Sequence, residues 1–94
     1  MSNQNSGIHL LSKDSAVSMI LLLDEEGEAG ASDLQKVKAN YYVALQLAMS
    51  LKEIGLINAK KVLTPRIAYS FSLTPKGKKV ADKLKEIQRI IDGQ

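Results

Sequence analysis

The 94-residue chain contains no cysteine, a single histidine and no long apolar run. The absence of cysteine excludes a disulfide framework and thiolate metal sites, and it fits an intracellular protein. The longest apolar run, Met19 to Leu23, is far too short to span a membrane, so we expect no membrane partner. His9 has no pair of metal-ligand type near it. We therefore expect no catalytic residue, no metal and no cofactor, and a protein that is not an enzyme.

Two further features resemble binding motifs but lack the required spacing. The acids between Asp24 and Glu28 do not show the alternating ligands and trailing glutamate of a calcium loop. Gly27 and Gly30 are not followed by the Lys-Ser/Thr pair of a phosphate-binding loop. The segment 24–30 is expected to be a solvated acidic loop.

Charge is distributed unevenly along the chain. Residues 1–34 hold one base and six acids, a net charge of −5, whereas residues 35–94 hold twelve bases and four acids, a net charge of +8. This asymmetry indicates a basic face for a polyanion such as nucleic acid, with the acidic part facing away. The alternative is a small lysine-rich protein that is basic only for solubility.

Apolar spacing and turn residues predict a mainly helical chain with one hairpin. One side of the segment 40–54 is apolar, and Ile67, Tyr69, Phe71 and Leu73 alternate with smaller residues. Ser12 is a plausible helix cap, and residues 1–10 are expected to be a disordered or extended tail. The expected helices are 12–23, 32–38, 40–54 and 75–92, and the expected strands are 56–63 and 67–73. The inward residues of the third helix are expected to be Val43, Ala44, Leu47, Ala48, Leu51 and Ile54.

Two short motifs are the most informative part of the sequence. Gly55-Leu56-Ile57 ends a helix and starts a strand, and Leu73-Thr74-Pro75-Lys76-Gly77 ends a strand and starts a capped helix. In this order and spacing, they resemble the winged helix-turn-helix of MarR-like and PadR-like DNA-binding proteins, with an archaeal type expected. The resemblance implies an α+β, mainly α fold. Residues 11–74 would form a winged helix-turn-helix domain with a three-helix core and a two-stranded wing, and residues 75–94 a C-terminal dimerisation helix.

The resemblance also implies a set of DNA-contacting residues. The helix 40–54 would enter the major groove, where Gln46 could pair with adenine, the tyrosines could contact phosphates or sugars, and Leu45 could touch thymine methyls. The implied reading residues are Asn40, Tyr41, Tyr42, Leu45, Gln46 and Met49. The implied phosphate and wing residues are Lys36, Lys38, Lys60, Lys61 and Arg66, with Arg66 able to reach a minor groove. Alternatively, Tyr42, Leu45 and Met49 pack against another protein.

The last helix carries a second apolar pattern. Val80, Leu84, Ile87 and Ile91 repeat at spacings of four, three and four, which is the seam of a coiled coil and also the pattern of a helix lying on its own domain. PadR-like proteins dimerise through a C-terminal helix, so the resemblance implies a dimer interface at these four residues. Five lysines early in the helix, at 76, 78, 79, 83 and 85, could contact phosphate or keep the surface soluble.

The function implied by the resemblance is sequence-specific binding of double-stranded DNA by a homodimer. A transcriptional regulator in the cytoplasm, associated with the nucleoid, is the main expectation. One alternative is a PadR-like adaptor of plasmid partition that coats DNA and recruits a second protein such as a partition factor. The other is a protein-interaction module that does not bind DNA.

Overall fold

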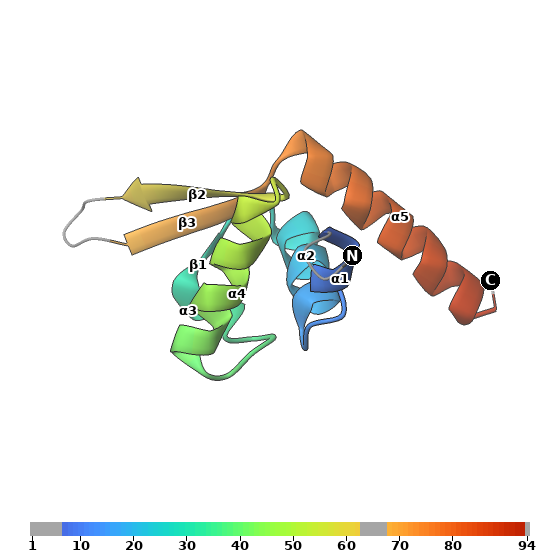
Figure 1. Cartoon of the computed structure of the whole chain (residues 1–94), viewed down its shortest axis with the longest axis horizontal. Helices are drawn as coiled ribbons and strands as arrows, with labels where there is room; N and C mark the ends of the chain where they lie inside the picture. The colour runs from blue at the N-terminus through green and yellow to red at the C-terminus, as the bar shows by residue number, and fades with distance from the viewer. Residues whose placement is uncertain (1–6, 63–67, 94) are drawn as a thin grey trace, which may run out of the picture.

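The computed structural model describes residues 7–62 and 68–93, and its elements form a small helical body with two projections (Figure 1). The hairpin of β2 and β3 projects on one side of the body, and α5 projects on the other. The mainly α, α+β fold class is confirmed. In chain order the elements are α1 (Gly7–Leu10), α2 (Ala16–Glu26), β1 (Ala29–Gly30), α3 (Ala31–Leu34), α4 (Tyr41–Glu53), β2 (Ile57–Val62), β3 (Ala68–Leu73) and α5 (Pro75–Ile91).

Phe71 lies at the centre of an antiparallel sheet with the strand order β1-β3-β2. Its partners in the neighbouring strands are Ala29 and Ala59, whose small side chains leave room for the fully buried ring. Tyr69 and Leu73, two residues to either side, are partly buried against the same core. The predicted alternation of this strand is therefore correct where the structure describes it; Ile67 lies outside the described residues. The other large, fully buried side chains are Met19, Ile20, Leu23, Leu34, Leu51 and Ile57.

The first predicted helix is displaced along the chain. The helix α2 begins at Ala16 rather than Ser12, because Ser15 adopts a left-handed backbone conformation with a φ of 72°. The Ser12 hydroxyl donates instead to the carbonyl of His9, 2.6 Å away, at the end of α1. That short helix occupies the last residues of the segment expected to be a disordered or extended tail.

The segment predicted as an acidic loop is largely ordered into elements. The helix α2 continues to Glu26, and Ala29 and Gly30 pair with β3 as the strand β1. The next helix, α3, is shorter than predicted and ends at Leu34, so that residues 35–40 form the turn before α4. The Asp33 carboxylate accepts a hydrogen bond of 3.0 Å from the Gly30 N–H and so joins β1 to α3.

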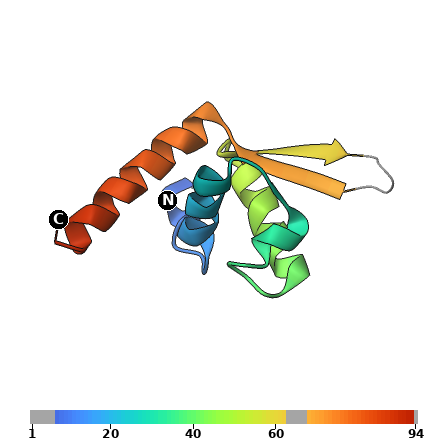
Figure 2. The same ribbon diagram turned by 180° about the vertical axis from the view of Figure 1, so that it is seen from behind.

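The start of α5 is fixed against the beginning of β2 (Figure 2). The Thr74 N–H donates to the Leu56 carbonyl at 3.0 Å, and the Thr74 hydroxyl donates to the Gly55 carbonyl at 2.6 Å and accepts from the Gly77 N–H at 2.9 Å. A Cβ atom on Gly77 would lie 2.1 Å from the Leu56 oxygen. Glycine at the end of the Leu-Thr-Pro-Lys-Gly motif is thus required by a close backbone approach.

Candidate nucleic-acid interface

The helix α4 is held firmly at both ends. At its start the Asn40 side chain accepts a 3.1 Å hydrogen bond from the Val43 N–H, as expected of an N-cap. At its end Gly55, with a φ of 86°, lets the Leu56 N–H donate back to the Leu51 carbonyl at 3.1 Å. Lys76 of α5 donates to the Ile54 carbonyl at 2.9 Å, which places a cation at the negative end of the helix.

The inward face of α4 agrees with the sequence except at its first turn. Ala44, Leu47, Ala48 and Leu51 are buried, whereas Val43 is 40% exposed. The prediction for Val43 is wrong because this first turn extends beyond the core and lines a surface hollow instead. The spacing of apolar residues shows which side of a helix faces the core, but it does not show how far along the helix the core extends.

The opposite face of α4 is the surface that the sequence assigned to DNA. Tyr42 is 76% exposed, and its ring meets Tyr41 edge to face with 5.3 Å between the ring centroids. Gln46 is exposed, whereas Leu45 and Met49 are half-buried at the margin of the core. This face therefore presents the amide of Gln46 and the phenols of the two tyrosines to a partner. Leu45 and Met49 are only partly accessible on it.

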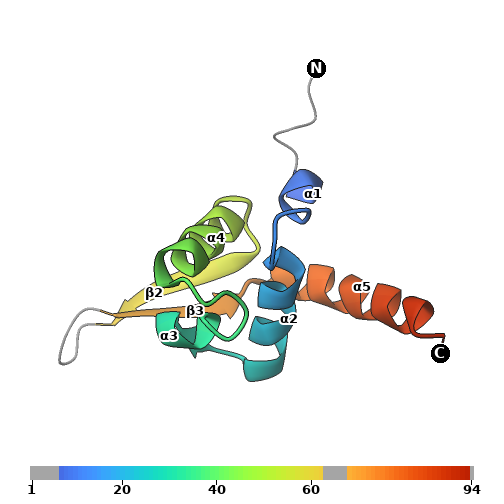
Figure 3. The same cartoon turned by 90° about the horizontal axis from the view of Figure 1, so that it is seen from below.

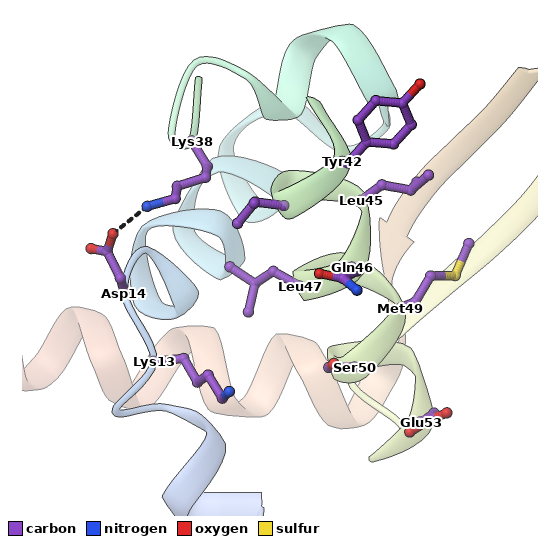
Figure 4. A pocket seen from close by; sticks show the side chains of 11 residues that line it. Lys13, Asp14, Lys38, Tyr42, Leu45, Gln46, Leu47, Met49, Ser50 and Glu53 are labelled. Atoms are coloured by element: carbon purple, nitrogen blue, oxygen red, sulfur yellow. Dashed lines mark hydrogen bonds and ion pairs between the residues drawn. The ribbon is translucent and has the colours of Figure 1, made fainter. Parts of the chain in front are cut away.

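A hollow of about 780 Å³ lies along α4, and the linker between α1 and α2 forms its other wall (Figure 4). Lys13 and Asp14 lie on that wall, and Lys38, which the sequence assigned to phosphate contacts, lines the hollow from the turn before α4. The sequence does not predict Lys13 and Asp14 as site residues, because a helix beginning at Ser12 would leave no linker at these positions. The residues lining the hollow are Lys13, Asp14, Lys38, Tyr42, Val43, Leu45, Gln46, Leu47, Met49, Ser50 and Glu53.

Lys36 and Lys38, assigned to phosphate contacts from the sequence, are both held in ion pairs within the chain. Lys36 lies 3.3 Å from the Glu26 carboxylate and 3.8 Å from Asp33, and the hydrogen bond to Glu26 raises its pKa. Lys38 donates to Asp14 at 2.5 Å, and this hydrogen bond lowers the pKa of the Asp14 carboxyl. Either lysine must exchange a carboxylate for a phosphate in order to contact DNA.

The wing lysines are arranged differently. Lys60 and Lys61 are both exposed on β2, opposite Ser70 and Tyr69 of β3. Since successive side chains of a strand alternate, the two lysines project from opposite faces of the hairpin. They do not form one continuous surface, but they could contact phosphates on both sides of a groove. Arg66 lies outside the described residues.

Two lysines of α5 form ion pairs with the acidic part of the chain. Lys78 lies 3.4 Å from Asp24, and Lys85 forms a second ion pair with the same carboxylate. The hydrogen bond from Lys85 lowers the pKa of Asp24, whose side chain is only 9% exposed, and the pairing raises the pKa of Lys85. Four acids of residues 1–34, namely Asp14, Asp24, Glu26 and Asp33, each pair with a lysine from the basic part of the chain, so the two parts are in direct contact.

The four residues of the α5 seam fall into two pairs. Val80 and Leu84 are half-buried and pack against the core of their own domain. Ile87 is 51% exposed and Ile91 is 76% exposed, on the part of α5 that extends away from the body (Figure 3). Ile90, which the sequence pattern did not include, is 74% exposed beside them.

Other kinds of site find no support in the part of the chain that the structure describes. No three histidine, aspartate or glutamate side chains of residues 7–62 and 68–93 gather where they could hold a metal ion. None of the helices in the same ranges has the length and apolar character that crossing a membrane requires.

Comparison with solved structures decides the fold. A transcriptional regulator homologue from Pyrococcus horikoshii superposes with a TM-score of 0.76 at 24% identity, over 93% of this chain and 89% of that one. A possible HxlR family transcriptional factor from Thermoplasma volcanium gives a TM-score of 0.80 at 19% identity, over 98% and 84%. The fold is a winged helix-turn-helix. A third structure, Streptococcus pneumoniae FabT in complex with DNA, gives a TM-score of 0.70 at 17% identity, over 93% of this chain and 69% of that one.

The MarR-like winged helix-turn-helix expected from the sequence is thus confirmed as a fold. At these identities, the likeness extends to the fold alone. No protein-family model matches the chain, and no curated protein matches it. Within the winged helix, α3 and α4 are the two helices of the helix-turn-helix, and β2 and β3 form the wing.

Proposed function

We propose that this winged-helix protein binds double-stranded DNA as a homodimer and regulates transcription, with α4 as its recognition helix. The observation that carries the proposal is the outward face of α4, where exposed Gln46 and Tyr42 stand on a helix capped at both ends. A rigid helix with an exposed amide suits the major groove, where glutamine can pair bidentately with adenine. The DNA-bound FabT structure supports the same use of the fold.

The charge arrangement favours modest electrostatic attraction. Lys60 and Lys61 are the described wing lysines available to phosphate, whereas Lys36 and Lys38 are already paired. Each phosphate neutralised contributes about 0.9 to the slope of log affinity against log salt. We expect a slope of a few units for a dimer, and a preference for A·T-rich sites set by the amide and the apolar edges of α4.

The dimer is proposed to form through the exposed end of α5. Ile87, Ile90 and Ile91 are large apolar side chains with half or more of their surface exposed. Burying such side chains against a second copy would contribute about 1.5–3 kcal/mol for each fully buried residue. A two-fold dimer would present two α4 helices to a palindromic or repeated site.

The test compares variants of the two proposed surfaces on a preferred and on a scrambled duplex. Gln46→Ala should cost about 1–3 kcal/mol on the preferred duplex and much less on the scrambled one, because the amide reads a base edge. Lys60→Gln with Lys61→Gln should weaken binding to both duplexes and flatten the salt dependence. Gln88→Ala, an exposed substitution on α5, is the matched control and should change neither.

The outcomes separate the proposal from its rivals. Equal losses for Gln46→Ala on both duplexes would contradict sequence reading by α4. DNA footprinting at rising protein concentration distinguishes the regulator from the partition adaptor. A footprint of constant length supports a regulator, and a footprint that lengthens indicates a protein that spreads along DNA, as expected of a partition adaptor.

A protein-interaction module is the second candidate function. Two observations favour it: Tyr42 and Val43 give the start of α4 an exposed apolar character, and Lys36 and Lys38 are neutralised by acids. Tyrosine is enriched at the centres of protein interfaces. The absence of any salt-dependent binding to duplex DNA would favour this candidate over the regulator.

A further inference from the structure

The linker between α1 and α2 is tied by two side-chain bonds to the turn just before α4. The Ser15 hydroxyl donates to the Val37 carbonyl at 3.0 Å, and Lys38 donates to the Asp14 carboxylate at 2.5 Å. Two consecutive linker residues thus bind two consecutive turn residues. The left-handed conformation of Ser15, which is rare for a residue with a side chain, sets the course of the linker at this point.

This contact places an acid beside the proposed reading face. Asp14, Lys38 and Gln46 all line the hollow along α4 (Figure 4). The Asp14 side chain is 79% exposed, and that of Lys38 is 31% exposed. A carboxylate oxygen bound to the Lys38 ammonium offers the same charge and the same hydrogen-bond acceptor as a DNA phosphate oxygen.

We infer that Asp14 is a specificity-determining residue, whose carboxylate occupies Lys38 in place of phosphate and so suppresses binding to non-target DNA. The inference rests on the proposed DNA-binding function. Phosphate contacts are the same on every sequence, so each one that is withheld lowers non-specific affinity. A negative charge directed against the wrong partner is a common source of specificity.

The pair is built so that a correctly placed duplex can displace it. An exposed ion pair is weak, because water competes for both partners. The Ser15 hydrogen bond involves no formal charge, so it keeps Asp14 near Lys38 when salt screens the ion pair. Base contacts from Gln46 would hold a target duplex in one register, where a phosphate can compete persistently for Lys38. On other sequences no base contacts hold the duplex in one register, so Lys38 stays paired with Asp14.

The experiment replaces Asp14 by its neutral isostere. Asp14→Asn should raise affinity for a scrambled duplex by up to roughly eightfold per phosphate gained at 0.1 M salt, and steepen the salt slope by about 0.9 per subunit. Affinity for the preferred duplex should rise less, so the ratio of the two affinities should fall. Glu25→Gln, which removes an exposed acid of α2 outside the hollow, is the matched control and should leave that ratio unchanged.

A second background tests whether Lys38 is the partner. With Lys38→Gln already present, Asp14→Asn should have no further effect on either duplex. Asp14→Glu keeps the charge and should behave like the unmodified protein. Thermal melting checks that each variant is folded, and Asp14→Ser repeats the test if the asparagine variant melts early.

The inference is overturned if Asp14→Asn matches Glu25→Gln, if it strengthens both duplexes equally, or if it acts equally in the Lys38→Gln background. In each of these cases the unmodified protein still binds DNA, so the proposed function stands. If none of the proteins binds either duplex, the proposed function fails as well.

Discussion

A single glycine determines how closely α5 approaches the rest of the domain. At Gly77 the missing side chain leaves room for the Leu56 carbonyl, which also accepts the Thr74 N–H. That carbonyl cannot move aside without losing its hydrogen bond. Glycine is ordinarily unfavourable within a helix by about 1 kcal/mol relative to alanine, so its presence in the first turn of α5 reflects this contact.

Gly77→Ala should therefore destabilise the fold although alanine is the better helix former. The steric cost of forcing a methyl group into a packed contact is about 1–3 kcal/mol, which exceeds the propensity gain. Urea unfolding would measure the change. Gly30→Ala is the matched control, since its backbone has a φ of −83° and its new Cβ would meet atoms no nearer than 3.8 Å. Equal stability of Gly77→Ala and the unmodified protein would contradict the contact.

At the residue scale, the sequence predicted local chemistry well and long-range partners poorly. Thr74 caps α5 and Gly55 ends α4, because both roles depend on neighbours a few residues away. The partners of Lys38, Lys76 and Asp24 lie 24, 22 and more than 50 positions away along the chain. Such ion pairs and long-range hydrogen bonds depend on tertiary packing, which no local pattern specifies.

At the scale of elements, Asp24 joins α2 to α5. Its carboxylate, nearly buried near the end of α2, receives Lys78 and Lys85 from the facing helix. The pKa of Asp24 is lowered in the folded state, so the unfolded chain binds a proton more readily than the folded one. The contribution of this contact is fully present above the unfolded pKa of about 3.9 and is lost as the pH falls through the lower folded pKa.

Asp24→Asn should reduce this acid sensitivity. The variant should be less stable than the unmodified protein at neutral pH, and the difference should shrink as the pH is lowered below about 4. Urea unfolding at a series of pH values measures both quantities. Asp92→Asn, at the exposed end of α5, serves as the control. A pH-independent difference for Asp24→Asn would mean that the ion pairs do not stabilise the α2–α5 contact.

Long periodic elements were predicted correctly, and short ones were not. The observed α4, α5, β2 and β3 lie within two residues of the predicted bounds, because Asn40 and Thr74 cap the two helices, and Gly55 and Thr74 mark where β2 begins and β3 ends. The strand β1 has only two residues and shows no alternation, so its pairing with β3 could not be read from the sequence. The start of α2 was missed because a left-handed serine gives no compositional signal.

At the scale of the whole molecule, the best test of the proposed dimer lies at Ile87 rather than Leu84. Leu84 packs partly on its own core, so a charge there would disturb folding and association together. Ile87 is 51% exposed and outside the buried core. Ile87→Glu should leave the thermal melting of the isolated domain nearly unchanged and yield a monomer at micromolar concentration, as measured by light scattering.

The same measurement on Gln88→Glu supplies the control, because it adds an acid at an exposed position one residue along α5. This variant should remain dimeric. A monomeric unmodified protein would contradict the proposed dimer outright, and a dimeric Ile87→Glu would place the interface on another surface.

Leu56 gives the molecule a fixed internal length. Its N–H donates to the last turn of α4 and its carbonyl accepts from the residue that caps α5, so one residue connects the two helices with little slack. If two copies join through α5, the separation of their α4 helices is set by this junction. One inserted base pair shifts a half-site by about 3.4 Å and turns it by roughly a tenth of a helical turn. A dimer joined in this way would lose affinity when the spacing between half-sites changes by one base pair, just as it would when a base within a half-site is changed.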